Sequence, residues 1–149
     1  MRTVRVERSI AAPADAVFEL LTDHAGYVRF RGVRSAELVR EGDAEPNGAG
    51  AMRRIVVGPI RFDEEITAFE RPRRMDYVIR AMNVPFDHEG GTIAVDGDER
   101  RSHVVWTSTF RVPTRGERAF TAIAAFAARQ GFERMLADVD RRLAGDQAI

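Results

Sequence analysis

Hydrophobic and polar residues alternate along most of the chain between residues 3 and 112. A period of two is typical of β-strands with one buried and one solvated face. The alternation predicts a first strand over residues 3–10 and further strands at about 33–41, 50–57, 60–69, 74–82, 87–96 and 102–112. Turn residues separate these later segments, and strands joined by such short connections are expected to pair antiparallel.

Two short helices are expected between the first and second strands. Pro13 suits a first helical position because proline lacks the N–H that would be unpaired there, and Asp15 complements the positive end of the helix. Asp23 can cap a second short helix, and Gly32 ends it before the strands resume.

A third helical pattern runs without interruption from Thr114 to about Ala144. The sequence Thr114-Arg115-Gly116-Glu117 at its start has the form of a capping box. In its second half, apolar residues at helical spacing predict a stripe that packs on the sheet: Phe132, Met135, Leu136, Val139 and Leu143. The first half is apolar nearly all round, so it is expected either to be covered by the core or to border an opening for an apolar ligand.

The order of these elements predicts an α+β fold in a single domain over residues 1–149. A helix of about 30 residues far exceeds the average of about 11 to 12, so in a small domain it must cross the whole body. We therefore expect a seven-stranded curved antiparallel sheet, with two short helices after strand 1 and the long C-terminal helix over its concave face. This layout implies a cavity between the helix and the sheet.

Two charged residues interrupt the apolar face of this sheet. Gly58-Pro59 fits a two-residue hairpin turn, which places Arg53 directly opposite Glu64. A buried ion pair is weakly justified by stability alone, so the pair is a candidate for orienting a ligand. The alternative is a solvated pair at the cavity mouth, or a register error that puts both residues outside.

The next hairpin extends the same face. A four-residue connection over residues 70–73 would pair Ala68 with Met75 and Ile66 with Tyr77. The predicted ligand-binding residues follow from this register and from the first half of the long helix: Arg53, Ile55, Phe62, Glu64, Ile66, Tyr77, Ile79, Trp106, Ser108, Phe110, Ile123 and Ala127. Aromatic residues on such a face are also ordinary core residues, and that alternative stays open.

His88 is a further candidate for acid–base chemistry, beside Glu64 and Arg53. Gly90-Gly91 could form a β-bulge that reverses the parity of the strand and turns His88 inward. The three histidines are too scattered along the chain to predict a compact metal site, and we expect no metal and no cofactor.

Composition removes several classes of function. The net charge is zero, with no basic stripe of the kind that binds nucleic acid. The chain has no Cys and no Lys, which excludes thiol nucleophiles, lysine Schiff bases and Walker-type phosphate loops. No apolar run approaches the roughly 18 residues of a membrane span, and the first residues lack the pattern of a secretory signal, so we expect a cytoplasmic protein without stable membrane insertion.

The order of elements resembles the START and birch-pollen-allergen superfamily (SRPBCC), with its helix-grip fold, and is most similar to the polyketide cyclase/dehydrase-like branch. The resemblance covers essentially the whole chain and is carried by residues 9–18, Leu21-Thr22-Asp23, Tyr27, residues 70–75 and Val105-Trp106-Thr107. It implies a hollow between sheet and helix that binds lipids, polyketides or other hydrophobic molecules. These motifs are structural, and the resemblance implies no shared catalytic signature.

Three functions are compatible with these observations. The leading hypothesis is non-covalent binding of a small hydrophobic or aromatic molecule. The second is a polyketide cyclase or dehydratase-like enzyme in which Glu64 or His88 acts as the base and Arg53 stabilises an enolate. The third is a protein–protein interaction module that uses an exposed face of the long helix. In each case a monomer or a homodimer is expected.

Overall fold

The computed structural model describes residues 1–147 and contains the predicted seven-stranded antiparallel sheet. The strands lie in the order β1-β7-β6-β5-β4-β3-β2. Their bounds are Arg2–Ile10 (β1), Val33–Arg40 (β2), Met52–Val57 (β3), Ile60–Glu70 (β4), Arg74–Met82 (β5), Asp87–Gly97 (β6) and Ser102–Arg111 (β7). The helices are α1 (Ala14–Thr22), the 3₁₀ helix η1 (Ala25–Arg29) and α2 (Glu117–Gln147). The predicted α+β helix-grip fold is confirmed.

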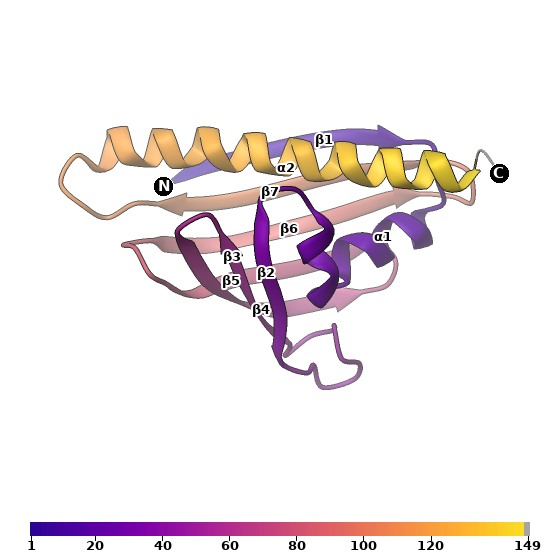
Figure 1. Ribbon diagram of the computed structural model, residues 1–149, viewed down its shortest axis with the longest axis horizontal. Helices are drawn as coiled ribbons and strands as arrows, with labels where there is room; N and C mark the ends of the chain where they lie inside the picture. Colours follow the sequence, from indigo (N-terminus) through magenta and orange to yellow (C-terminus); the bar gives the residue numbers. More distant parts are fainter. Residues whose placement is uncertain (148–149) are drawn as a thin grey trace.

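The sheet and α2 form two layers. In Figure 1, α2 runs beside β1 along the length of the molecule, while α1 lies below the C-terminal end of α2. Helix α2 packs against β1, β7 and α1. The C-terminal half of α2 therefore has a second helix beneath it, whereas its N-terminal half faces only the sheet.

The Gly58-Pro59 turn sets the register as predicted. Gly58 has a positive φ of 55°, a backbone conformation that glycine adopts without steric cost. Val57 lies opposite Ile60, and the same ladder places Arg53 opposite Glu64. The two charged residues thus meet on one face of the sheet.

The predicted connection between β4 and β5 is wrong in detail. Glu70 pairs with Arg74, so the connection has three residues instead of four, and Ala68 lies opposite Asp76 instead of Met75. A register shift between Ile66 and Ala68 then restores the predicted parity. Such a bulge inserts one unpaired residue into a strand, and here it compensates for the shorter turn.

The predicted capping box at the start of α2 is also wrong. The helix begins at Glu117, and the carbonyl of Gly116 accepts the bond from the N–H of Phe120. Gly116 has a φ of 82°, so the chain turns sharply there, and Thr114 lies outside the N-cap position. Glycine tolerates this conformation at no cost, which is why the helix starts after it.

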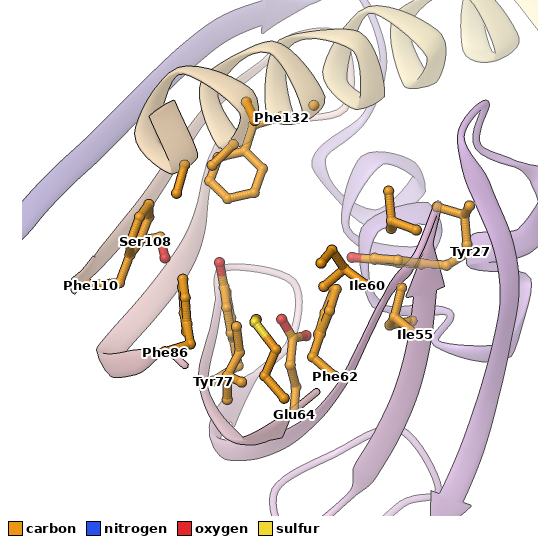
Figure 2. A pocket seen from close by; sticks show the side chains of 18 of the residues that line it. Tyr27, Ile55, Ile60, Phe62, Glu64, Tyr77, Phe86, Ser108, Phe110 and Phe132 are labelled. Atoms are coloured by element: carbon orange, nitrogen blue, oxygen red, sulfur yellow. The ribbon is translucent and has the colours of Figure 1, made fainter. Parts of the chain in front are cut away.

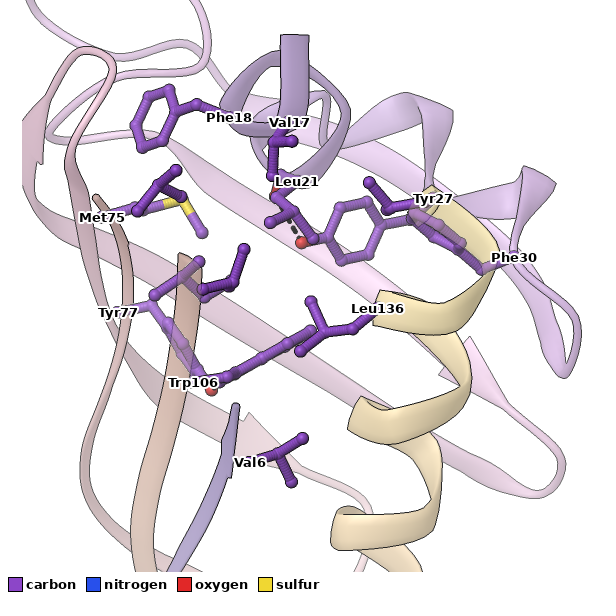
Figure 3. Packing of buried hydrophobic residues seen from close by; sticks show 14 of the residues in the cluster. Val6, Val17, Phe18, Leu21, Tyr27, Phe30, Met75, Tyr77, Trp106 and Leu136 are labelled. Atoms are coloured by element: carbon purple, nitrogen blue, oxygen red, sulfur yellow. Dashed lines mark hydrogen bonds between the residues drawn. The ribbon is translucent and has the colours of Figure 1, made fainter. Parts of the chain in front are cut away.

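A solid core lies beneath the C-terminal half of α2. Val17, Phe18 and Leu21 of α1 are fully buried and gather near Met75 of β5, while Leu136 points toward the sheet (Figure 3). Leu136 and Val139 are fully buried, and the other residues of the predicted stripe pack against the core: Phe132, Met135 and Leu143. The prediction that this stripe faces the sheet is confirmed.

Candidate functional site

A cavity of about 300 Å³ lies between the sheet and the N-terminal half of α2. Its helical wall consists mostly of small residues, Ala124, Ala127, Ala128 and Gly131, followed by Phe132 and Met135. Figure 2 shows Phe132 above the space and sheet residues such as Tyr77 and Phe110 pointing into it from below. The space exists because side chains of this size cannot reach across to the sheet.

The sheet supplies a mostly apolar wall with a few polar groups. All but two of the residues predicted to bind a ligand line the cavity: Arg53, Ile55, Phe62, Glu64, Tyr77, Ile79, Trp106, Ser108, Phe110 and Ala127. Ile66 is fully buried in the core, and Ile123 is 64% exposed, so neither lines the cavity. The remaining lining residues were not predicted as such: Tyr27, Val33, Val57, Ile60, Met82, Phe86, Ala124, Ala128, Gly131, Phe132 and Met135.

Arg53 and Glu64 form a buried ion pair at one end of the cavity. Arg53 is 2% exposed and Glu64 is 5% exposed. The Nε–H of Arg53 donates to Oε2 of Glu64 at 2.6 Å, and Nη2 contacts the same oxygen. Burial would lower the pKa of Arg53, but Glu64 and Tyr27 together outweigh it and raise that pKa, so the guanidinium stays charged.

Two residues that the sequence did not indicate hold this guanidinium in place. The Nη1–H of Arg53 donates to Nδ1 of His24 at 3.1 Å, and the guanidinium carbon lies 4.5 Å from the centre of the Tyr27 ring. The other ring nitrogen of His24 donates to the carbonyl oxygen of Asn47 at 2.8 Å. Burial, reinforced by the charge of Arg53, lowers the pKa of His24 to about 3, so this imidazole is neutral.

His88 forms a hydrogen bond with Ser108. A register shift lies between His88 and Gly90, just before the predicted Gly90-Gly91 bulge, and it places His88 opposite Phe110 on the concave side of the sheet. The backbone N–H of Ile79 donates to Nδ1 of His88 at 2.9 Å, so the ring proton resides on Nε2 and is donated to Oγ of Ser108, also at 2.9 Å.

This arrangement disfavours His88 as a general base. Burial lowers its pKa to about 4, and the single lone pair of the neutral ring already accepts a backbone hydrogen bond. His88 is also not among the residues that line the cavity. Its evident effect is to fix the orientation of the Ser108 hydroxyl.

Tyr77 depends on a glycine in the neighbouring strand. A Cβ atom on Gly91 would lie 2.2 Å from Cζ of Tyr77, so only glycine allows the ring to lie over β6. The indole N–H of Trp106 donates to the Tyr77 hydroxyl at 2.7 Å. Burial raises the pKa of Tyr77, so its hydroxyl remains protonated.

A family model described as polyketide cyclase/dehydrase and lipid transport matches residues 1–144. The chain belongs to this family. No curated protein matches the sequence. The resemblance inferred from the order of elements is thereby confirmed.

Solved structures of similar shape support the fold. A protein from Thermus thermophilus aligns with a TM-score of 0.77 at 23% identity, over 97% of this chain and 99% of its own. A START superfamily protein from Mycobacterium smegmatis aligns at 0.71 and 13%, over 96% and 97%. The Zhui aromatase/cyclase from Streptomyces sp. R1128 aligns at 0.70 and 22%, over 95% and 94%. At these identities the likeness to these structures establishes the fold alone.

Outside the cavity, the main surface feature is a group of exposed apolar residues on α2. Within residues 1–147, no helix is long and apolar enough to cross a bilayer, and no group of three or more potential metal ligands is assembled. Phe120, Ile123 and Phe126 are exposed on α2. These side chains agree with the hypothesis of an interaction module, which stays a prediction because nothing in the structure indicates what would cover them.

Proposed function

We propose that this protein binds a small hydrophobic molecule non-covalently between the sheet and the N-terminal half of α2. The observation that carries the proposal is the cavity itself, about 300 Å³ with walls formed mainly by aliphatic and aromatic side chains. Burying eight ligand methylene groups would contribute about 6 kcal/mol, at about 0.8 kcal/mol each, before association costs. Since a dissociation constant of 1 μM corresponds to about 8.2 kcal/mol, this burial supports weak non-covalent binding, and polar contacts must add to it for micromolar affinity.

Two measurements test this proposal. Native mass spectrometry of freshly purified protein should reveal a co-purified molecule of low mass. After delipidation, titration with the neutral fluorophore N-phenyl-1-naphthylamine should give saturable binding with a dissociation constant of micromolar order. Absence of both a bound mass and probe binding would contradict the proposal.

Matched variants distinguish the cavity from the exposed face of α2. Phe62 lines the cavity, whereas Phe126 is 66% exposed on the helix. Phe62→Ala should weaken probe binding about tenfold or more, because it removes an aromatic wall, while Phe126→Ala should leave binding unchanged. The reverse pattern would place the probe on the surface and count against a cavity ligand.

A second candidate function is catalysis of ring closure in a poly-β-ketone. One observation favours it: a carboxylate, Glu64, lies in an apolar cavity where it could accept a proton from a carbon between two carbonyl groups. Incubation with a short poly-β-ketone thioester would show loss of water by mass spectrometry. A catalyst with Glu64→Gln should lose turnover while retaining the ligand, whereas a pure carrier should change only in affinity.

A further inference from the structure

The polar end of the cavity has a defined set of unused hydrogen-bonding groups. Arg53 directs its Nε and Nη2 toward Oε2 of Glu64 and donates from Nη1 to His24. Oε1 of Glu64 accepts no hydrogen bond within residues 1–147. It is not fully buried, so a ligand can reach it. Since Glu64 lines the cavity, this oxygen is an acceptor available to a ligand.

Two hydroxyl groups on the same wall are available as donors. Tyr77 accepts a hydrogen bond from Trp106, and Ser108 accepts one from His88, so each hydroxyl keeps its own hydrogen for another partner. Both residues line the cavity with Glu64; in Figure 2 Tyr77 lies beside Glu64, and Ser108 lies next to Phe110. The wall thus offers one carboxylate acceptor and two hydroxyl donors to the same enclosed space.

The net charge of this polar end is zero. The positive charge of Arg53 is paired with the negative charge of Glu64, and both neighbouring imidazoles are neutral. A ligand carboxylate would add an unpaired negative charge beside Glu64, and a ligand ammonium group would add a positive charge beside Arg53. Either would be costly in a cavity with apolar walls.

We infer that the cavity selects neutral ligands carrying a hydroxyl, enol or N–H group, which donates to Glu64 and accepts from Tyr77 or Ser108, and that it discriminates against carboxylates. This inference rests on the proposed function and adds the chemical class of the ligand. Arg53 belongs to a neutralised pair, so it does not serve as an anchor for the head group of a fatty acid.

The test uses naphthalene derivatives of nearly equal shape with the delipidated protein at pH 7. 2-Naphthol carries a neutral hydroxyl, 2-methylnaphthalene has no polar group, and 2-naphthoate is an anion. Calorimetry should show 2-naphthol binding about tenfold more tightly than 2-methylnaphthalene, since its hydroxyl gains a hydrogen bond to a charged carboxylate. The affinity for 2-naphthoate should be at least tenfold lower than that for 2-naphthol.

Replacing Glu64 should invert this preference. Glu64→Gln leaves the charge of Arg53 unpaired and gives the cavity a net positive charge, so 2-naphthoate should bind at least tenfold more tightly than it binds the parent protein. Glu65→Gln is the matched control, because Glu65 lies on the opposite face with Arg40 and Arg80 and should change neither affinity. A gain of affinity for one ligand is a result that mere loss of structure could not produce.

The outcomes separate this inference from the proposed function. If none of the three compounds binds the parent protein, the proposed function fails. If 2-methylnaphthalene and 2-naphthoate bind as tightly as 2-naphthol, the cavity is confirmed and the charge selection is overturned. Should Glu64→Gln not fold, the double variant Tyr77→Phe/Ser108→Ala provides the variant test: it removes both donors and should reduce the preference for 2-naphthol over 2-methylnaphthalene, and an unchanged preference would count against the inference.

Discussion

The two halves of α2 make opposite contacts with the same sheet. In the C-terminal half, Leu136 and Val139 point inward and are completely buried above α1. In the N-terminal half, the large apolar side chains of Phe120, Ile123 and Phe126 are exposed, and alanines and a glycine face the sheet. One half is a packed core (Figure 3), and the other is the roof of a cavity (Figure 2).

The difference shows that side-chain size on the inward face decides between core and cavity. Both halves are rich in apolar residues, so the number of apolar residues alone does not distinguish them. A large inward side chain fills the space to the density of a protein interior, whereas an alanine at the same depth leaves it open. The rotation of the helix therefore determines what the site can hold, and variants at inward and outward positions test this comparison directly.

The largest expected effect comes from breaking the packed half. Leu136→Ala should reduce the free energy of unfolding by about 2 to 5 kcal/mol, because it removes buried methyl groups and leaves a void. Ile123→Ala, on the outward side of the other half, should change it by less than about 0.5 kcal/mol. Urea denaturation of both variants measures the difference, and equal losses would contradict the contrast.

Acid should destabilise the protein through its two buried histidines. The pKa values of His24 and His88 are lowered to about 3 and about 4, whereas an unfolded histidine titrates near 6.5. Between these values the unfolded state binds more protons than the folded state, so stability falls as the pH falls below about 6.5. Each histidine contributes about 2 kcal/mol, so we expect a loss of up to about 4 kcal/mol between pH 7 and pH 5.

Urea denaturation across this pH range tests the assignment. His24→Gln should remove part of the pH dependence, because the variant cannot take up the same proton when it unfolds. The loss caused by Leu136→Ala should be the same at both pH values, since Leu136 does not titrate and makes no hydrogen bond to either histidine. A flat stability profile for the parent protein between pH 7 and pH 5 would contradict the neutral, buried state of the two histidines.

The fold could be predicted because its determinants are local. Alternation gave the strands, and Gly58 fixed the ladder that joins Arg53 to Glu64. The bulge near Ile66 could not be predicted, because it depends on how the shorter turn meets the rest of the sheet. The capping box was predicted wrongly because Gly116 has a positive φ, which delays the start of the helix to Glu117. The neighbouring residues gave no sign of this conformation.

The candidate site was only partly predictable. The predicted strand register identified most of the sheet residues that line the cavity. His24 and Tyr27 contact Arg53 from a separate segment, and that contact exists only after the tertiary fold forms. Ile123 was misplaced because the N-terminal half of α2 is apolar nearly all round. In such a segment periodicity does not indicate which side faces inward, and only packing against the sheet decides it.

The smallest expected effect on stability should accompany a large effect on binding. Ala128 lines the cavity and is half-buried, so Ala128→Leu should extend a larger side chain into open space instead of into packed atoms. The free energy of unfolding should change by less than about 1 kcal/mol, since little strain is introduced. Binding of N-phenyl-1-naphthylamine should weaken about tenfold or more, because the new side chain occupies volume that the probe needs.

Ala144 is exposed on the same helix and away from the cavity, so Ala144→Leu should change neither the stability nor the affinity for the probe. If Ala128→Leu instead destabilised the protein as much as Leu136→Ala, the N-terminal half would be packed core and the distinction between the two halves of α2 would not hold.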